Sequence, residues 1–223
     1  MKYHLWKGNT YIEFEDWEHE LSVWEREHFP QYFEKSKYYW TDKQKKLKNA
    51  VELYAGWGYR DYNELLRTQK LTRPNKNRLI RIKEAIEVIS TATEENTVPE
   101  NLVAYRFLGE KYFYNLKRNV KNQLLGRRFL EKGFCSTTLT RKSYESHIAN
   151  IKYPEPTVIL KILIPKNTHG IFVTPLAGRP SEAELLLAPF TEFRILQHSS
   201  IAHNQYLCTI TEQTHHLLLE SNT

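Results

Sequence analysis

The sequence predicts an α+β fold in which helices come first and strands follow. Residues 41–98 carry apolar side chains at helical spacing, whereas residues 99–214 contain short β-like runs separated by glycines and prolines. Helices followed by strands, without regular alternation, favour an α+β fold over a parallel α/β fold. A length of 223 residues with 40% hydrophobic residues is enough for one domain with its own core.

An aromatic-rich extension, residues 1–40, precedes the helical part. It holds 12 of the 29 aromatic residues, and Trp17, Leu21 and Trp24 recur at the spacing of one short amphipathic helix. So many aromatic side chains are expected to pack against the rest of the domain. The alternative is docking of a partner, such as a carrier or an antitoxin or immunity protein.

Three helices are expected between residues 41 and 98. The first is capped by Thr41 and ends at Gly56 and Gly58, the second covers residues 61–69, and the third starts at the cap Asn75. The polar residues 91–100 are expected to end this helical part. The apolar faces of the first and third helices consist of Leu47, Ala50, Val51 and Tyr54, and of Leu79, Ile82, Ile86 and Ile89.

The β-rich part, residues 99–214, begins with a strand at residues 102–108 that Gly109 closes. Residues 111–130 are expected to be helical or looped. Further strands are expected at residues 134–139, 157–164, 170–174, 184–188, 192–197 and 205–211.

Charge and composition narrow the classes of function. The net charge is +6, and two runs, residues 65–83 and 111–132, are strongly basic, with Glu131 the one acid in the second. Such runs are typical of solvated faces, with nucleic acid or an acidic partner as alternatives. Cys135 and Cys208 lie in apolar runs, which predicts buried thiols, and the histidines lack ligand spacing, so no metal site is expected.

No secretory signal and no membrane-spanning run is visible. The first ten residues are polar, and the longest apolar run, residues 183–190, contains Glu184. We therefore expect a soluble protein without membrane insertion, either cytoplasmic or delivered into a target cell without a cleavable signal peptide.

Three short motifs carry candidate chemistry. Arg106 lies inside an apolar strand, where an anion such as phosphate would balance its charge, unless it points to water from an edge strand. Ser136, in the run Ser-Thr-Thr, can orient a carboxylate, although β-propensity also explains this run. Glu182 and Glu184 are two residues apart, so on one strand they would share a face; the alternative is a solvated strand edge.

In this order and at this spacing, the three motifs resemble the Arg, Ser-Thr-Ser and Glu-x-Glu signature of arginine-type mono-ADP-ribosyltransferases. The likeness is to bacterial toxins, including the enzymatic components of binary toxins that modify actin, with Thr138 in place of the last serine. Residues 50–67 are similar to the family's helix–turn–helix, with Tyr54, Tyr62, Asn63 and Arg67 at its polar positions. The resemblance covers about residues 45–210.

The resemblance implies N-terminal helices packed on a mixed, mainly antiparallel two-sheet β core with a central NAD⁺ cleft. NAD⁺ would be the co-substrate, without a metal. Glu184 would stabilise positive charge on the ribose as nicotinamide leaves, and Ser136 would hold Glu184. Arg106 would pair with the phosphates, while the backbone of Phe107 and the ring of Tyr62 would lie at the nicotinamide.

The resemblance also implies further contacts to NAD⁺ and to the target, through residues outside the three motifs or beside their main residues. Asn63 and Thr137 would complete the NAD⁺ site, Arg141 would give a second phosphate contact, and Tyr144 would form an aromatic lid. Substrate recognition would involve Glu182 and the loop before it, through Leu176 and Arg179.

Glu182 favours a protein arginine as the acceptor. A second carboxylate can attract a guanidinium and take its proton, whereas relatives that modify asparagine carry glutamine there. The target would be actin-like or another protein. Two alternatives stay open: a transferase that modifies RNA or DNA, which the basic runs would support, and a non-catalytic NAD⁺-binding module.

Overall fold

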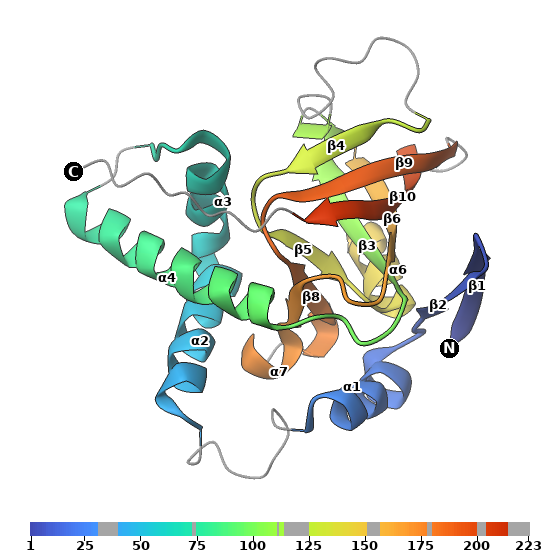
Figure 1. Ribbon diagram of the computed structural model, residues 1–223, viewed down its shortest axis with the longest axis horizontal. Helices are drawn as coiled ribbons and strands as arrows, with labels where there is room; N and C mark the ends of the chain where they lie inside the picture. Colours follow the sequence, from blue (N-terminus) through green and yellow to red (C-terminus); the bar gives the residue numbers. More distant parts are fainter. Residues whose placement is uncertain are drawn as a thin grey trace.

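The computed structural model describes residues 1–30, 40–72, 75–110, 112–113, 125–150, 157–177, 180–199 and 204–213. A layer of helices lies against one end of a strongly twisted sheet, and the N-terminal segment packs at another edge (Figure 1). Arg179, which was expected to recognise the target, falls outside these residues.

The N-terminal segment is part of the sheet. β1 (Lys2–Trp6) and β2 (Asn9–Glu13) form a hairpin whose two-residue turn places Lys7 at φ 48° and Gly8 at φ 79°, which glycine adopts readily. β2 pairs with β3 in parallel at Ile12. The carboxylate of Glu13 is buried and accepts a hydrogen bond from the Tyr105 hydroxyl. The sequence predicted a helix in this segment and missed the hairpin.

The predicted helix of the N-terminal segment is present as the π-helical turn η1 (Trp17–Leu21) followed by α1 (Ser22–His28). Leu21 and Trp24 are buried, and the ring of Trp24 lies 5.4 Å from that of Phe14 and 5.3 Å from that of Phe172. Phe14 and Trp24 therefore belong to the main core, and Trp17 and Phe29 pack against it.

The helical layer consists of α2 (Asp42–Leu53), α3 (Tyr59–Thr68) and α4 (Lys76–Glu95). Both predicted caps are confirmed: Thr41 forms a capping box with Gln44, and the side chain of Asn75 accepts from the backbone N–H of Arg78. The glycines do not end the first helix, because the π-helical turn η4 (Tyr54–Gly58) joins α2 directly to α3.

α4 continues into the polar residues that were expected to end it. Ala92 and Thr93 are 5% and 0% exposed, so this last turn packs on the core despite its composition. The apolar stripe predicted for this helix is confirmed at Ile82, Ile86 and Ile89, which are all buried.

The sheet is mixed and mainly antiparallel, as predicted. Its hydrogen-bonded order is β4-β9-β10-β6-β3-β5-β8-β7, in which only β10–β6 and the attached β2–β3 pair are parallel among the described strands. The strands are β3 (Leu102–Gly109), β4 (Arg128–Glu131), β5 (Cys135–Thr138), β6 (Thr157–Ile164), β7 (Gly170–Phe172), β8 (Glu184–Leu187), β9 (Thr191–Ser199) and β10 (Asn204–Gln213).

The sheet has two parts that meet at a single residue pair. β3 pairs with β6 along its whole length, but with β5 only at Tyr105↔Thr138. β4–β9–β10–β6–β3 therefore diverges from β5–β8–β7 directly after Tyr105. Arg106 is the next residue on β3, so the divergence lies beside it.

β4 and three helical segments differ from the prediction. Residues 111–130 were expected to be helical or looped, but β4 ends this stretch with Phe129 and Glu131 buried and Leu130 exposed. A buried acid beside an exposed leucine hides the usual alternation of a strand. The segments α6 (Arg141–Asn150), α7 (Thr174–Ala177) and η5 (Pro180–Glu182) were not predicted.

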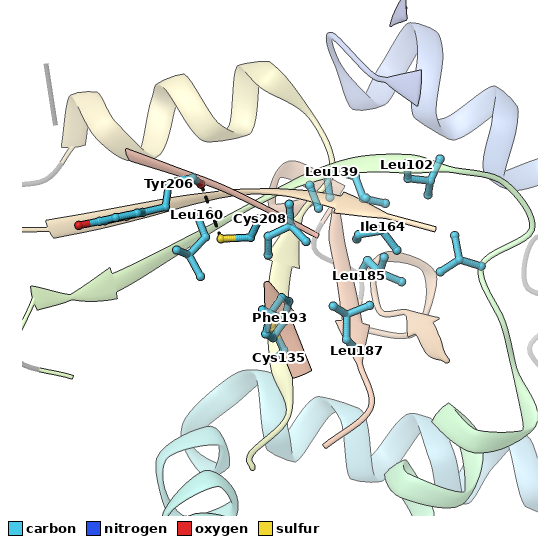
Figure 2. Packing of buried hydrophobic residues seen from close by; sticks show 14 of the residues in the cluster. Leu102, Cys135, Leu139, Leu160, Ile164, Leu185, Leu187, Phe193, Tyr206 and Cys208 are labelled. Carbon is cyan, nitrogen blue, oxygen red and sulfur yellow. Dashed lines mark hydrogen bonds between the residues drawn. The ribbon is translucent and has the colours of Figure 1, made fainter. Parts of the chain in front are cut away.

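Buried side chains form a main core within the sheet, a second core under the helices, and a small cluster of Tyr11, Val103, Tyr105 and Leu163. The main core includes Cys135 and Cys208, which confirms the prediction of buried thiols (Figure 2). Burial raises the pKa of Cys135 to about 11. The second core joins the helices to the sheet through Phe134, Ile171 and Leu186.

None of the helices within the described ranges is both long enough and apolar enough to span a membrane.

Phe14 tests whether the N-terminal segment is integral to the domain. Its side chain is 0% exposed in the main core, so Phe14→Ala should lower the free energy of unfolding by about 3–5 kcal/mol in a urea titration. Tyr3→Ala, at a 65% exposed position of the same segment, is the control and should change it by less than about 0.5 kcal/mol. Equal effects of the two variants would contradict the packing.

Glu25 should make stability depend on pH. Burial raises its pKa to about 7, which the hydrogen bond from Trp17 Nε1 (3.2 Å) offsets only in part. A carboxyl group whose pKa is higher in the folded than in the unfolded protein stabilises the folded state when it is protonated. This contribution is complete below the unfolded pKa, about 4.3, and is lost as the pH rises through the folded pKa, about 7. When the pH rises from 5 to 8, the free energy of unfolding of Glu25→Gln should therefore increase relative to that of the wild type by roughly 1–3 kcal/mol.

The matched control for this pH effect is Glu27→Gln, at an exposed position of the same helix. Urea unfolding at the two pH values measures both variants against the wild type. A Glu25→Gln difference that stays constant between pH 5 and pH 8 would show that Glu25 is ionised throughout.

Candidate active site

Two adjacent strands bring Ser136 and Glu184 together. β5 and β8 are antiparallel with Thr138 opposite Glu184, which places Ser136 and Glu184 diagonally on one face. The Ser136 hydroxyl donates a hydrogen bond to Glu184 Oε1, and the backbone N–H of Glu184 donates to Thr174 Oγ1 at 3.0 Å. Glu184 is 7% exposed, so its carboxylate is held in a fixed, largely desolvated position.

Glu182 does not share a strand with Glu184. Glu182 ends η5 and is exposed, and its backbone carbonyl accepts a 2.8 Å hydrogen bond from Thr138 Oγ1. Ala183 follows in the left-handed region at φ 46°, and the strand begins only at Glu184. The prediction of two carboxylates on one strand face is therefore wrong, because the chain turns between them.

Arg106 is buried and meets an anion from within the chain. It is 9% exposed, and its Nη2 donates to Glu131 Oε2 at 2.9 Å. Its Nη1 lies 3.4 Å from the backbone oxygen of Ser136, which brings it next to the Ser136–Glu184 pair. Arg106 therefore does not point to water from a strand edge.

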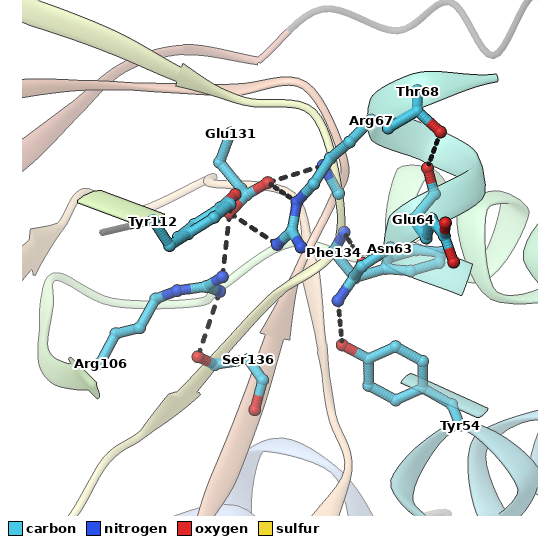
Figure 3. Close-up of polar contacts among 11 residues, drawn as sticks. Tyr54, Asn63, Glu64, Arg67, Thr68, Arg106, Tyr112, Glu131, Phe134 and Ser136 are labelled. Atoms are coloured by element: carbon cyan, nitrogen blue, oxygen red, sulfur yellow. Dashed lines mark hydrogen bonds and ion pairs between the residues drawn. The ribbon is translucent and has the colours of Figure 1, made fainter. Parts of the chain in front are cut away.

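Glu131 is the centre of a buried polar cluster that joins α3, β3 and β4 (Figure 3). Besides Arg106, its carboxylate accepts hydrogen bonds from Nε and Nη2 of Arg67 at 3.0 and 3.1 Å, and from the Tyr112 hydroxyl at 2.7 Å. The backbone N–H of Gly133 donates to it at 2.8 Å. Five donors thus surround a side chain that is 2% exposed.

The charge of Glu131 is stabilised in spite of its burial. Burial by itself would raise its pKa, but the charges of Arg106 and Arg67 and the hydrogen bonds from Arg67 and Tyr112 lower it below its ordinary value. Two guanidinium groups around one carboxylate leave one net positive charge. The sequence offered one signal for this residue: Glu131 is the only acid in the basic run 111–132.

Asn63 fastens α3 to the start of β5. Its Oδ1 accepts from the backbone N–H of Phe134 at 2.8 Å, and its Nδ2 donates to the Tyr54 hydroxyl at 3.3 Å. A Cβ at Gly133 would lie 2.6 Å from Asn63 Oδ1, so this close approach requires glycine. Burial and, next, the charge of Glu184 raise the pKa of Tyr54, which keeps its phenol protonated.

Tyr62, expected at the nicotinamide, is 3% exposed and packs against the Tyr54 ring at 5.8 Å. It lines a hollow of about 700 Å³ between the helices α2, α3 and α4. Arg106, Ser136 and Glu184 are not among the residues that line this hollow.

Tyr144, which was expected to form an aromatic lid, packs on the other face of β3 from Arg106. Tyr144, on α6, stacks on Tyr105 and Phe107 with ring centroids at 4.3 and 5.8 Å. These two residues flank Arg106 on the strand, so their side chains occupy the opposite face of β3. On the same helix, Nε of Arg141 donates to Glu145 at 2.8 Å.

Thr137 and Leu176 are both directed into the interior. The Thr137 hydroxyl donates to the backbone oxygen of Leu185 at 2.8 Å, and its side chain faces away from Ser136. Leu176 is 2% exposed in the core under the helices, so the expectation that it touches a target protein is wrong. Across the residues described, no three His, Cys, Asp or Glu side chains gather closely enough to hold a metal ion.

Known proteins resemble the chain in sequence pattern and in fold. The model of the ADP-ribosyltransferase exoenzyme family matches residues 10–220. No curated protein sequence matches. Among solved structures, the ADP-ribosyltransferase Vis in complex with agmatine is 20% identical, with a TM-score of 0.60, and the match covers 87% of this chain and 86% of that one.

Two further structures show the same fold. The enzymatic component C2-I of the C2-toxin from Clostridium botulinum is 20% identical, with a TM-score of 0.63; the match covers 94% of this chain but 54% of C2-I. C3stau2 from S. aureus with NAD is 17% identical, with a TM-score of 0.61 and coverage of 91% and 99%.

Proposed function

The chain belongs to the ADP-ribosyltransferase exoenzyme family, and we propose that it transfers ADP-ribose from NAD⁺ to an arginine of a target protein, as a toxin or effector. The observation that carries this proposal is the Ser136–Glu184 hydrogen bond beside the buried Arg106. These three residues come from two parts of the sheet and meet where those parts diverge.

The charges of the site suit NAD⁺ as the co-substrate. Arg106, Arg67 and Glu131 together carry one net positive charge, which can meet the diphosphate. Glu184 supplies a fixed negative charge for the positive charge that grows on the ribose as the bond to nicotinamide breaks. Ser136 keeps Glu184 in place during this change, so no reorganisation is needed.

Glu182 supports arginine as the acceptor. Its exposed side chain precedes Glu184 by two residues and can be reached by an incoming macromolecule. It would take a proton from the guanidinium as the guanidinium nitrogen bonds to the ribose carbon that nicotinamide leaves. Vis, one of the structural relatives, binds agmatine, which carries the same guanidinium group as arginine.

A nucleic-acid acceptor has weaker support. Two of the basic residues in the run 65–83 are paired inside the chain: Arg67 with Glu131, and Arg78 with Asp61. Internal pairing reduces the charge available for a phosphate backbone. A non-catalytic module would not need the Ser136–Glu184 contact, which is why we favour an active enzyme.

Two glutamine substitutions separate cleavage from transfer. Glu184→Gln should lower both nicotinamide release and ADP-ribose transfer by about 10²–10³-fold, because it removes the charge next to the ribose. Glu182→Gln should leave nicotinamide release within about threefold but lower transfer to arginine or agmatine by about 10²-fold or more. Full transfer by Glu182→Gln would show that Glu182 is not the base.

The acceptor can be identified with labelled NAD⁺ and a cell lysate. The sample is treated in parallel with protease, nuclease or hydroxylamine, and Glu184→Gln protein serves as the control. Protease-sensitive label that hydroxylamine releases is the expected result for an arginine linkage. Label that disappears with nuclease would instead identify a nucleic-acid acceptor.

A further inference from the structure

We propose that Glu131 is a positioning residue for the transfer reaction: it fixes the guanidinium of Arg106 so that one edge stays directed at the diphosphate of NAD⁺. This inference rests on the transferase function proposed above. Glu131 lies outside the three motifs, on the strand β4 that the sequence did not predict.

Glu131 acts through its neighbours rather than on the substrate. Its side chain is 2% exposed, and both carboxylate oxygens already accept hydrogen bonds within the protein. Oε1 accepts from Arg67 and Gly133, and Oε2 accepts from Arg67, Arg106 and Tyr112. A carboxylate with five donors has little capacity left for a ligand.

The cluster binds one edge of the Arg106 guanidinium more strongly than the other, and the buried thiol of Cys135 also contacts this guanidinium. Nη2 is bound to Glu131 at 2.9 Å, whereas Nη1 lies 3.4 Å from the Ser136 oxygen, beyond the usual length of a strong hydrogen bond. A phosphate oxygen that approaches from the side of Ser136 would therefore meet the weakly bound edge. This edge contacts the backbone oxygen of Ser136, whose hydroxyl binds Glu184, so phosphate binding would be linked to the reacting end of the site.

Arg67 makes the position of Glu131 itself rigid. It binds both oxygens through Nε and Nη2, and its guanidinium lies 4.4 Å from the centre of the Tyr112 ring. Without the carboxylate, Arg67 and Arg106 would be two neighbouring cations that repel each other. Arg106 would then turn toward another acceptor, such as Glu184, and lose its direction.

Equilibrium binding of ADP and adenosine to Glu131→Gln tests this inference without requiring turnover. ADP carries a diphosphate and adenosine carries none, so only ADP reports on Arg106. We expect Glu131→Gln to weaken ADP and NAD⁺ binding by about tenfold or more and to change adenosine binding less than about twofold. In nicotinamide release, KM for NAD⁺ should rise by the same factor while kcat stays within about threefold.

Leu65→Ala is the matched control for lost stability. Leu65 lies on α3 between Asn63 and Arg67, is 3% exposed, and belongs to the core under the helices. It should lower the unfolding temperature without weakening ADP binding. If Glu131→Gln does not fold, Glu131→Asp keeps the charge but withdraws it by one methylene, and should weaken ADP binding about threefold or more with adenosine unchanged.

The outcomes separate this inference from the proposed function. A folded Glu131→Gln or Glu131→Asp protein that binds ADP as the wild type does would overturn the role of Glu131. The role of Glu131 would also be overturned if the Glu131 variants lost adenosine binding as much as ADP binding. The same holds if Leu65→Ala lost as much ADP binding as the Glu131 variants. A wild-type protein that binds ADP and NAD⁺ but releases no nicotinamide would instead overturn the transferase function.

Discussion

A single buried carboxylate, that of Glu131, connects the parts of the molecule on which the candidate site depends. Burying a charge costs several kcal/mol unless it is paired and fully hydrogen-bonded. Here α3 supplies Arg67, β3 supplies Arg106, and the turn before β5 supplies the N–H of Gly133. Moving any of these elements would remove at least one donor from a buried charge, so the cluster restricts their relative positions.

This restriction matters because the sheet alone does not fix the two sides of the site. Arg106 lies on the part that contains β3 and β6, whereas Ser136 and Glu184 lie on β5 and β8, and the two parts share one residue pair. One residue pair provides little backbone hydrogen bonding between β3 and β5. Two further hydrogen bonds hold the start of β5: the backbone N–H of Gly133 donates to Glu131, and the backbone N–H of Phe134 donates to Asn63.

The local elements of this fold could be predicted from the sequence, because caps and apolar periodicity act over a few residues. Thr41, Asn75 and the stripe of α4 are examples. The features that could not be predicted depend on residues far away in the sequence. The role of Glu131 can be interpreted only once β4 pairs with β9 and Glu131 meets Arg67. Leu176 is buried by helices that lie about 90 to 130 residues before it in the chain. Likewise, the positive φ of Ala183 is not visible in a Glu-x-Glu spacing.

The turn at Ala183 gives the two glutamates different environments, and this difference fits two different tasks. Glu184 is buried and held by Ser136, so its charge acts in a region of low dielectric where it stabilises a developing cation strongly. Glu182 is exposed, where its carboxylate is accessible to a large partner. On one strand face both carboxylates would be buried together, and their like charges would repel each other. We infer that the turn separates the two carboxylates, so that one serves the ribose and the other serves the acceptor.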